Sequence, residues 1–290
     1  MRNVDRFRAF KLWWENAMTY SDRMTVLARL GFAARGLVYI LVGWLAFDAS
    51  RTGAEPSDNQ GALGTLGDTA LGHVILAICA IGFAGYAFWR LAEGALDPEA
   101  RGRTNKGKFE RVAHLVSGGA NALLCIIAGR LALRSSPANH GSPGDESAQS
   151  WSAWLLDKPG GVALLVAVGL GLFMVAAAQA LKAYKAGFDE LDGDVPAPSY
   201  VRWIGRLGYS ARAVVFAMIG WLLISAALQH DPTRAGGLGD ALAELRAQPE
   251  GSWILAIIGV GLSLFGVFSL VEARYRRLRV PIPRTPTGLR

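Results

Sequence analysis

Six blocks of apolar residues divide the chain, and each block is about as long as a helix that crosses a membrane. The blocks cover roughly residues 32–49, 71–92, 112–133, 161–182, 209–229 and 252–271. A helix needs about 20 mostly apolar residues to cross a hydrocarbon core of about 30 Å. The interiors of the blocks carry very few charges, and 52% of the 290 residues are hydrophobic. The sequence therefore predicts an all-α integral membrane protein with six transmembrane helices, rather than a soluble helical protein.

The distribution of basic residues predicts how these helices are oriented. Residues 1–29, 90–111, 182–206 and 272–290 hold 22 of the 30 Lys and Arg residues, whereas the three alternate loops hold six. Because Lys and Arg favour the cytoplasmic side of a membrane, both termini are expected in the cytoplasm. This placement also accounts for the net charge of +7 without a nucleic-acid partner.

Nearly the same amino-acid sequence occurs at the start of the first and fifth blocks. The stretch RLGFAARGLVYILVGWL (29–45) is matched by RLGYSARAVVFAMIGWL (206–222), and residues 26–47 and 203–224 share nine identities in 22 positions. Apolar helices resemble one another by composition, but composition does not place arginine, glycine and tryptophan in the same register. The match therefore indicates an internal repeat.

The second helices of the repeats align as well. The stretch GFAGYAFWRLAEGA (82–95) lies over GLSLFGVFSLVEAR (261–274), and a weaker copy lies between the two, with Arg111 at the position of Arg29. Each unit crosses the membrane twice, so we predict three parallel two-helix repeats about an axis perpendicular to the membrane. The expected parts are a basic N-terminal segment (1–28), repeats at 29–100, 108–188 and 203–276, and a basic tail (277–290).

These motifs resemble a bacterial membrane family called domain of unknown function 1206. The resemblance is carried by the Arg-Leu-Gly-x-x-Ala-Arg opening of the first helix, the Gly-Trp-Leu further along it, and the Pro-x-Gly before the second helix. It covers about residues 24–275 and is weakest in the middle repeat, which lacks the second arginine and the Gly-Trp. The resemblance implies tandem two-helix transmembrane repeats in the inner (plasma) membrane of a bacterium, and it assigns no activity or catalytic residue.

The repeated arginine inside an apolar helix needs an explanation, because an unpaired charge is costly there. Arg35 and Arg212 can extend toward the cytoplasmic edge, where the second helices of their repeats end with Glu93 and Glu272. The middle repeat has lost both members together. We therefore predict structural ion pairs Arg35–Glu93 and Arg212–Glu272. Two alternatives stay open, namely a pair between neighbouring repeats and charges that only face lipid headgroups.

A second group of polar residues lies within the predicted spans. His114, Ser117 and Asn121 are spaced i, i+3, i+7 and share one helix face, with Gln179 on the partner helix. This stripe could line a proton or solute path, or it could make a structural contact between repeats. Small residues four or seven apart, such as Gly36 and Gly43, favour close helix packing; a ligand slot beside the glycines is the alternative.

Signatures of enzymes and metal sites are not found in the sequence. GxSxG, HExxH and Walker A motifs are missing, and the two cysteines, Cys79 and Cys125, both fall in predicted spans without metal-ligand spacing. We therefore expect no catalytic residue, no cofactor and no metal site.

The expected function is that of a non-enzymatic membrane scaffold or partner-binding protein. The alternative is a small-solute or ion transporter or channel, with a path near the pseudo-threefold axis. The lipid bilayer is the expected partner, and the basic N-terminal segment carries Phe7, Phe10, Trp14 and Met18 at helical spacing. That segment is either a helix on an anionic membrane surface or a loosely ordered tail.

Overall fold

The structure is a computed structural model that describes residues 26, 29–66, 70–96, 105–133, 143–185, 191 and 199–275. The first helix spans Arg29–Thr52. It is followed by α2 (Asn59–Leu66), α3 (Ala70–Leu96), α4 (Asn105–Leu133), α5 (Pro143–Leu156), α6 (Gly161–Lys185), α7 (Ser199–Gln229), the short 3-10 helix η3 (Pro232–Arg234), α8 (Leu238–Ala247) and α9 (Gly251–Tyr275). The basic tail (277–290) and, apart from Val26, the N-terminal segment (1–28) lie outside the described residues.

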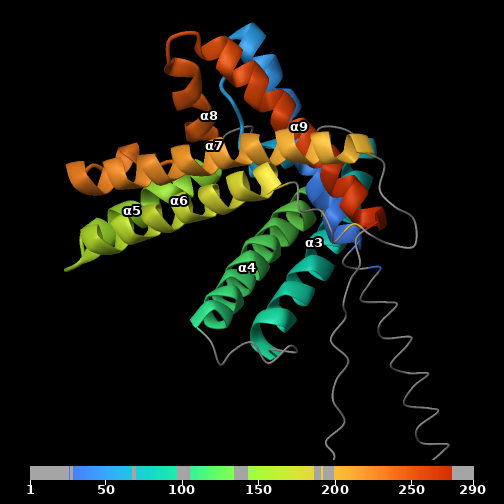
Figure 1. Cartoon of the computed structure of the whole chain (residues 1–290), viewed down its shortest axis with the longest axis horizontal. Helices are drawn as coiled ribbons and strands as arrows, with labels where there is room; N and C mark the ends of the chain where they lie inside the picture. The colour runs from blue at the N-terminus through green and yellow to red at the C-terminus, as the bar shows by residue number, and fades with distance from the viewer. Residues whose placement is uncertain are drawn as a thin grey trace, which may run out of the picture.

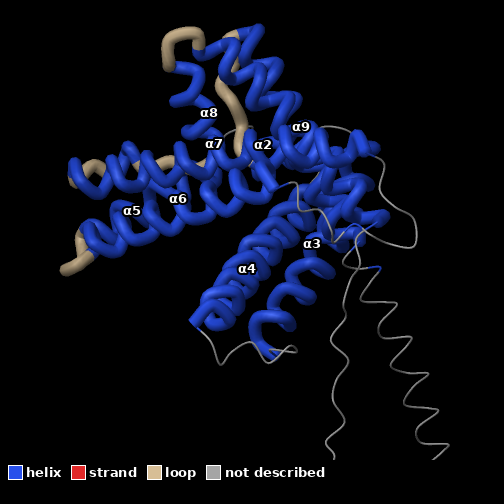
Figure 2. The backbone as a smooth tube through the Cα atoms, viewed as in Figure 1, coloured by secondary structure: helices blue, strands red, loops and turns tan. Residues whose placement is uncertain are grey.

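Six of these helices are long and apolar enough to cross a membrane, namely the first helix, α3, α4, α6, α7 and α9. They confirm the six predicted spans. In each repeat a shorter helix, α2, α5 or α8, lies between the two long ones. We call the side of the molecule with these shorter helices the cap side, and the opposite side, with Arg29, Lys185 and Tyr275, the terminal side. Figure 2 shows that the described chain is helical apart from its connecting loops.

The long helices pair across repeats. The second helix of one repeat packs along the first helix of the next, so that α3 pairs with α4 and α6 with α7. The second helix of the third repeat, α9, packs against the first helix of the first repeat, where Gly266 lies against the backbone of Gly36. Figure 1 shows these three helix pairs diverging from one another. Because α7 also contacts α9 within the third repeat, the three repeats close into one unit.

Glycines lie at close contacts in all three pairs, and in two of the pairs a glycine of one helix faces a glycine of the other. A Cβ atom built on Gly259 would lie 2.7 Å from the carbonyl oxygen of Gly43, and one built on Gly220 would lie 2.9 Å from the carbonyl oxygen of Gly169. The two contacts occupy equivalent repeat positions, so the same close contact occurs twice. The structure therefore confirms that these small residues serve close helix packing.

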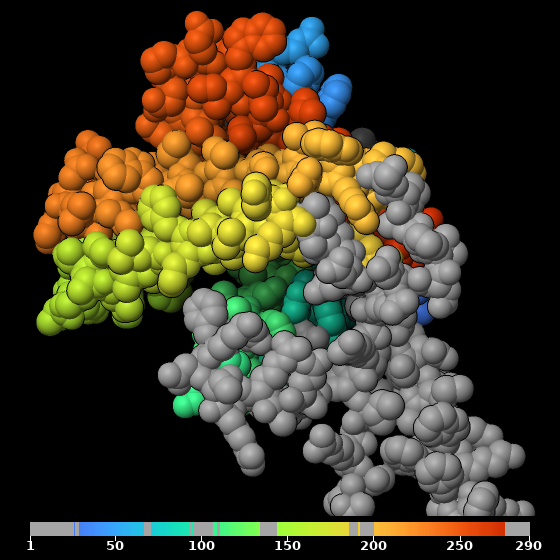
Figure 3. Space-filling view, in the orientation of Figure 1, coloured from blue at the N-terminus to red at the C-terminus, as the bar shows by residue number. Residues whose placement is uncertain are grey.

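The first and third repeats contribute most of the buried core. In an apolar stretch of 18 residues within α9, 50% of the residues are buried, compared with 11% in the corresponding stretch of α4, which belongs to the middle repeat. Figure 3 shows the α6–α7 pair and the α8–α9 part as separate lobes of the molecular surface. The middle repeat therefore presents most of its apolar surface outward, where lipid or a partner would meet it.

The cap helices differ in what they contact. Leu63 of α2 and Leu242 of α8 are completely buried in the main core, so these helices pack onto the long helices rather than lie on a membrane surface. In contrast, Trp151 and Trp154 of α5 are exposed, as expected for tryptophans at a membrane interface.

Candidate functional site: a charged centre between the first and third repeats

A buried ion pair joins the first helix to α9. The Nη2 atom of Arg35 donates to the Oε2 atom of Glu272, whose side chain is only 3% exposed. The Nε atom of Arg35 also donates to the hydroxyl of Ser269 at 3.2 Å, and this hydroxyl in turn donates to the carbonyl of Phe265 at 3.0 Å. The arginine is thus held by two residues one turn apart on the same helix.

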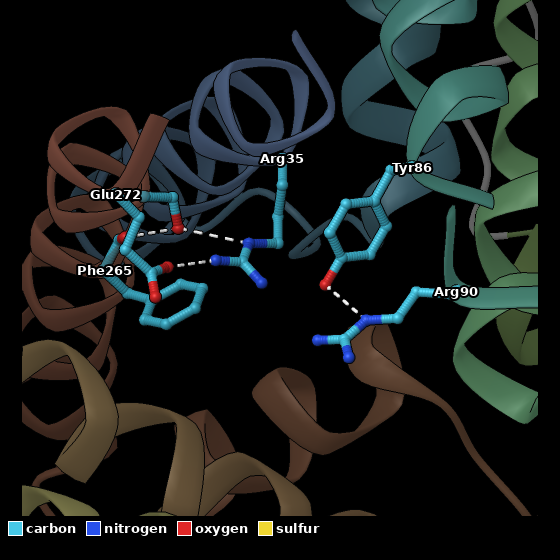
Figure 4. A network of polar contacts seen from close by, with 6 residues as sticks. Arg35, Tyr86, Arg90, Phe265 and Glu272 are labelled. Atoms are coloured by element: carbon cyan, nitrogen blue, oxygen red, sulfur yellow. Dashed lines mark hydrogen bonds and ion pairs between the residues drawn. The ribbon is translucent and has the colours of Figure 1, made fainter. Parts of the chain in front are cut away.

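Aromatic rings lie around the guanidinium of Arg35. The Arg35 guanidinium lies 4.8 Å from the centroid of the Phe32 ring and 5.3 Å from that of Phe265. Figure 4 shows Arg35 between Glu272 and Phe265 on one side and Tyr86 of α3 on the other. Tyr86 accepts a hydrogen bond at 3.0 Å from the Nε atom of Arg90. Cations over aromatic faces are stabilised electrostatically when water is excluded, so the rings reduce the cost of these buried charges.

The observed pair crosses between repeats, whereas the pairing predicted from the sequence lay within each repeat. Glu272 was expected to pair with Arg212, but it pairs with Arg35. Arg212 instead places its guanidinium 4.3 Å from the centroid of the Phe265 ring, and its Nε atom is buried without a hydrogen-bond partner. The side chain of Glu93 lies outside the described residues. The alternative of a pair between neighbouring repeats is therefore the one that Arg35 adopts.

The physical reason for this correction is the helix pairing described above. The first helix lies along α9, so the charged end of α9 meets Arg35 rather than the arginine of its own repeat. Arg212 lies on α7, which pairs with α6, and the α6 residue at the position of Glu272 is Lys182. Arg212 therefore has a lysine where Arg35 has a glutamate.

A second repeated arginine has a role that the sequence did not reveal. Arg111 donates to the carbonyl oxygens of Gly94 and Ala95 at 2.8 and 3.1 Å. The equivalent Arg206 donates to the carbonyl oxygens of Ala183 and Tyr184 at 3.2 and 3.0 Å. The last carbonyls of a helix lack intrahelical partners, so each arginine caps the second helix of the preceding repeat. The equivalence of Arg111 and Arg206 in the repeat alignment was a sign that the two residues share a role. The carbonyl groups that they cap could not be identified from the sequence, because they depend on which helices pair.

The polar stripe of α4 and Gln179 lie on helices that pair with different neighbours. His114, Ser117 and Asn121 are half-buried, and the Asn121 side chain donates to the Ser117 carbonyl of its own helix at 2.8 Å. Gln179 lies on α6, which pairs with α7, whereas α4 pairs with α3. The structure thus places the stripe and Gln179 in two different helix pairs.

Three carboxylates gather at the cap side. Asp58 accepts from the backbone N–H of Gly61 and Gly144 at 2.7 and 2.8 Å, and Asp145 accepts from Gly237 at 2.8 Å. These bonds link the shorter helices of all three repeats. Burial, together with the nearby carboxylates of Asp240 and Asp58, raises the pKa of the Asp145 carboxyl to about 6, although backbone hydrogen bonds oppose the shift.

This raised pKa predicts a stability that falls as the pH rises. The folded protein binds the Asp145 proton more tightly than the unfolded chain, so the stabilisation is fully present below about pH 4 and is lost as the pH approaches 6. Replacing Asp145 with asparagine should remove this part of the pH dependence of the melting temperature. The exposed Asp157→Asn variant should keep it; an unchanged slope in Asp145→Asn would contradict the assignment.

The fold and the charged centre define the class of protein, a membrane protein of three tandem two-helix repeats whose first and last repeats are joined by a buried ion pair. The chain belongs to the family Domain of Unknown Function (DUF1206), whose model matches three times, at residues 30–97, 112–186 and 207–276. The membership inferred from the motifs is thereby confirmed. The chain is also 33% identical over 254 residues to the Uncharacterized protein YxxB of Bacillus subtilis (strain 168), a match that covers 86% of this chain and 90% of that protein. No solved structure gives a significant match.

Proposed function

We propose that this protein is a non-enzymatic scaffold or partner-binding protein of the bacterial plasma (inner) membrane. The observation that carries the proposal is the apolar, closely packed centre of the described helices. Leu76 of α3, Val42 of the first helix and Leu255 of α9 are completely buried in one hydrophobic cluster. A route for ions or polar solutes needs polar groups that converge at membrane depth, and this cluster contains apolar side chains instead.

The charged centre supports a structural role for its ion pair. Arg35 is held by Glu272 and Ser269 and is covered by aromatic rings, so its hydrogen-bonding groups serve the contact between the first and third repeats. A rigid body closed in this way can present the outward faces of α4 and α6 to a partner. The alternative, a small-solute or ion transporter or channel, rests on the half-buried stripe of His114, Ser117 and Asn121.

The native cysteine Cys79 provides a test that separates these two functions. Cys79 is 2% exposed within the main core. In a Cys125→Ala background, a small water-soluble thiol reagent is expected to leave Cys79 unmodified in the native protein and to modify it after denaturation in detergent. Modification of native Cys79 would reveal a water-filled path through the centre and would favour the transporter.

The proposed orientation has the termini and the terminal side in the cytoplasm, on the basis of the 22 Lys and Arg residues in the sequence segments 1–29, 90–111, 182–206 and 272–290. In a cysteine-free background, cysteines at the exposed cap-side positions Glu55 and Thr233 should react with an impermeant thiol reagent added to intact cells. Cysteines at the exposed terminal-side positions Lys108 and Lys185 should react only after the membrane is permeabilised. The reverse pattern would invert the proposed topology.

A further inference from the structure

The three helix pairs offer three equivalent places for an acidic partner of the repeated arginine. In the pair of α9 with the first helix, Glu272 fills this place beside Arg35. In the pair of α6 with α7, the equivalent residues are Lys182 and Arg212. Here two cations occur where the other pair has a cation and an anion.

Arg212 is held by aromatic rings alone among the described residues. Its guanidinium lies 4.3, 5.1 and 5.2 Å from the ring centroids of Phe265, Phe216 and Tyr39, and its Nε atom is buried without a hydrogen-bond partner. Aromatic faces stabilise the charge but leave the N–H donors in the plane of the guanidinium unsatisfied. A buried donor in this state costs free energy, so Arg212 favours an added acceptor.

Lys182 belongs to the same aromatic cluster. Its amino nitrogen lies 4.6 Å from the centroid of the Tyr209 ring. The centroid of the Tyr209 ring lies 5.3 Å from that of Phe265, the ring against which the Arg212 guanidinium packs. Each cation therefore lies against one ring of an edge-to-face aromatic pair, Lys182 against Tyr209 and Arg212 against Phe265. Lys182 lies in the last turn of α6, close to the terminal side, where a group from the membrane surface or the adjoining solution can reach it.

The α6–α7 pair differs from the pair of α9 with the first helix at one repeat position. Residue 272 of α9 is the glutamate that pairs with Arg35, whereas the equivalent residue 182 of α6 is a lysine. At this position α6 therefore supplies Arg212 with a second positive charge instead of a carboxylate. An uncompensated charge at membrane depth is expensive, and a bound anion would remove this cost.

We propose that Arg212 and Lys182 bind a phosphate group at the terminal side of the α6–α7 pair, in the place that the Glu272 carboxylate occupies in the equivalent pair. The guanidinium of arginine matches the oxygens of a phosphate with parallel N–H donors, and lysine adds a point charge. The phosphate comes either from the headgroup of an anionic phospholipid or from free phosphate in the adjoining solution.

Lys182→Glu is the decisive variant because it places in α6 the carboxylate that α9 already has. The introduced carboxylate should pair with Arg212, keep the protein folded and fill the phosphate site. Binding of phosphatidylglycerol, measured by native mass spectrometry in detergent against phosphatidylcholine, should weaken about tenfold or more in this variant, as for loss of a charge-assisted contact. Lys182→Gln provides a milder change should Lys182→Glu fail to fold.

The exposed Lys185→Glu is the matched control, since it makes the same charge change in the last turn of the same helix. It should bind phosphatidylglycerol like the wild type. A second arm measures the melting temperature of lipid-depleted protein in inorganic phosphate and in chloride at equal ionic strength. If the melting temperature rises in phosphate but not in chloride, and this rise is lost in Lys182→Glu, free phosphate is identified as the ligand. The proposal fails if the wild type shows neither preference, or if Lys182→Glu retains the preference that the wild type shows.

Discussion

Replacing Glu272 with glutamine is expected to lower the free energy of unfolding by about 3–5 kcal/mol, the usual cost of removing one partner from a buried ion pair. The carboxylate is almost completely buried and receives the Arg35 guanidinium directly. Without it, Arg35 keeps its charge inside an apolar span, with only Ser269 and the aromatic rings as partners. The measurement is reversible unfolding in one defined detergent or bilayer mimic.

A double-mutant cycle isolates the contribution of the pair itself. Arg35→Met should cost about as much as Glu272→Gln, and the double variant should cost little more than either single change, because the second change removes a group that has already lost its partner. The exposed pair Arg234–Asp231, with side chains 52% and 39% exposed and 3.3 Å apart, provides the matched control. Its coupling should be about 0–1 kcal/mol, as for surface pairs in general.

The same design separates the observed pairing from the pairing within the repeat. A cycle of Arg35→Met with Glu93→Gln should give additive effects, because Arg35 is already bonded to Glu272 and Ser269. Strong coupling to Glu93, with none to Glu272, would restore the pairing that the sequence first suggested and would contradict the helix order of the structure.

Much of this fold could be predicted from the sequence because each prediction depended on a property of one helix or one repeat. The length of an apolar block fixes a span, and the shared register of Arg35 with Arg212 fixes the equivalence of two repeats. Neither property depends on which other helix lies alongside. The six spans and the three-repeat architecture were therefore predictable, and the structure and the family match bear them out.

The partner of Arg35 was harder to predict because it depends on how neighbouring repeats pack. An alignment of repeats tells which positions are equivalent but not which helices touch, and Glu93 and Glu272 are equivalent in the alignment. Only the closure of the third repeat onto the first decides between them. The aromatic residues around Arg35 are likewise supplied by two repeats, with Phe32 from the first and Phe265 from the third.

One feature of the sequence did indicate the correct partner. The first helix has glycines at 36 and 43, and α9 has glycines at 259 and 266, with the same separation of seven residues. The second helix of the first repeat has alanines, Ala80 and Ala87, at the equivalent positions. Two helices that each carry glycines two turns apart can approach closely at both levels, so the spacing indicated that α9 lies along the first helix. The first helix also meets α3 closely, at Gly31 and Gly82.

The close contact at Gly259 leads to the second prediction with a large expected effect. Gly259→Ala should destabilise the protein by roughly 1–3 kcal/mol, as for other overpacked sites. The added Cβ atom would lie 2.7 Å from the Gly43 carbonyl oxygen and 2.8 Å from the Phe47 backbone nitrogen. Both of these atoms belong to a helix backbone, which cannot rotate away as a side chain can. The first helix and α9 would therefore have to separate, and the Arg35–Glu272 bond would weaken with them.

A glycine-to-alanine substitution at an open position of a helix should have the opposite effect on stability. Gly171 lies in α6, and apart from the adjacent backbone of its own helix no atom lies within 4 Å of its added Cβ atom. Gly171→Ala should therefore stabilise the protein by about 0.5–1 kcal/mol through helix propensity. Thermal unfolding of both variants under identical conditions measures the difference between them. Because both variants exchange glycine for alanine inside an apolar helix, propensity alone would make them equally stabilising. Equal gains would show that the first helix and α9 do not meet at Gly43, and the closure of the third repeat onto the first would then be wrong.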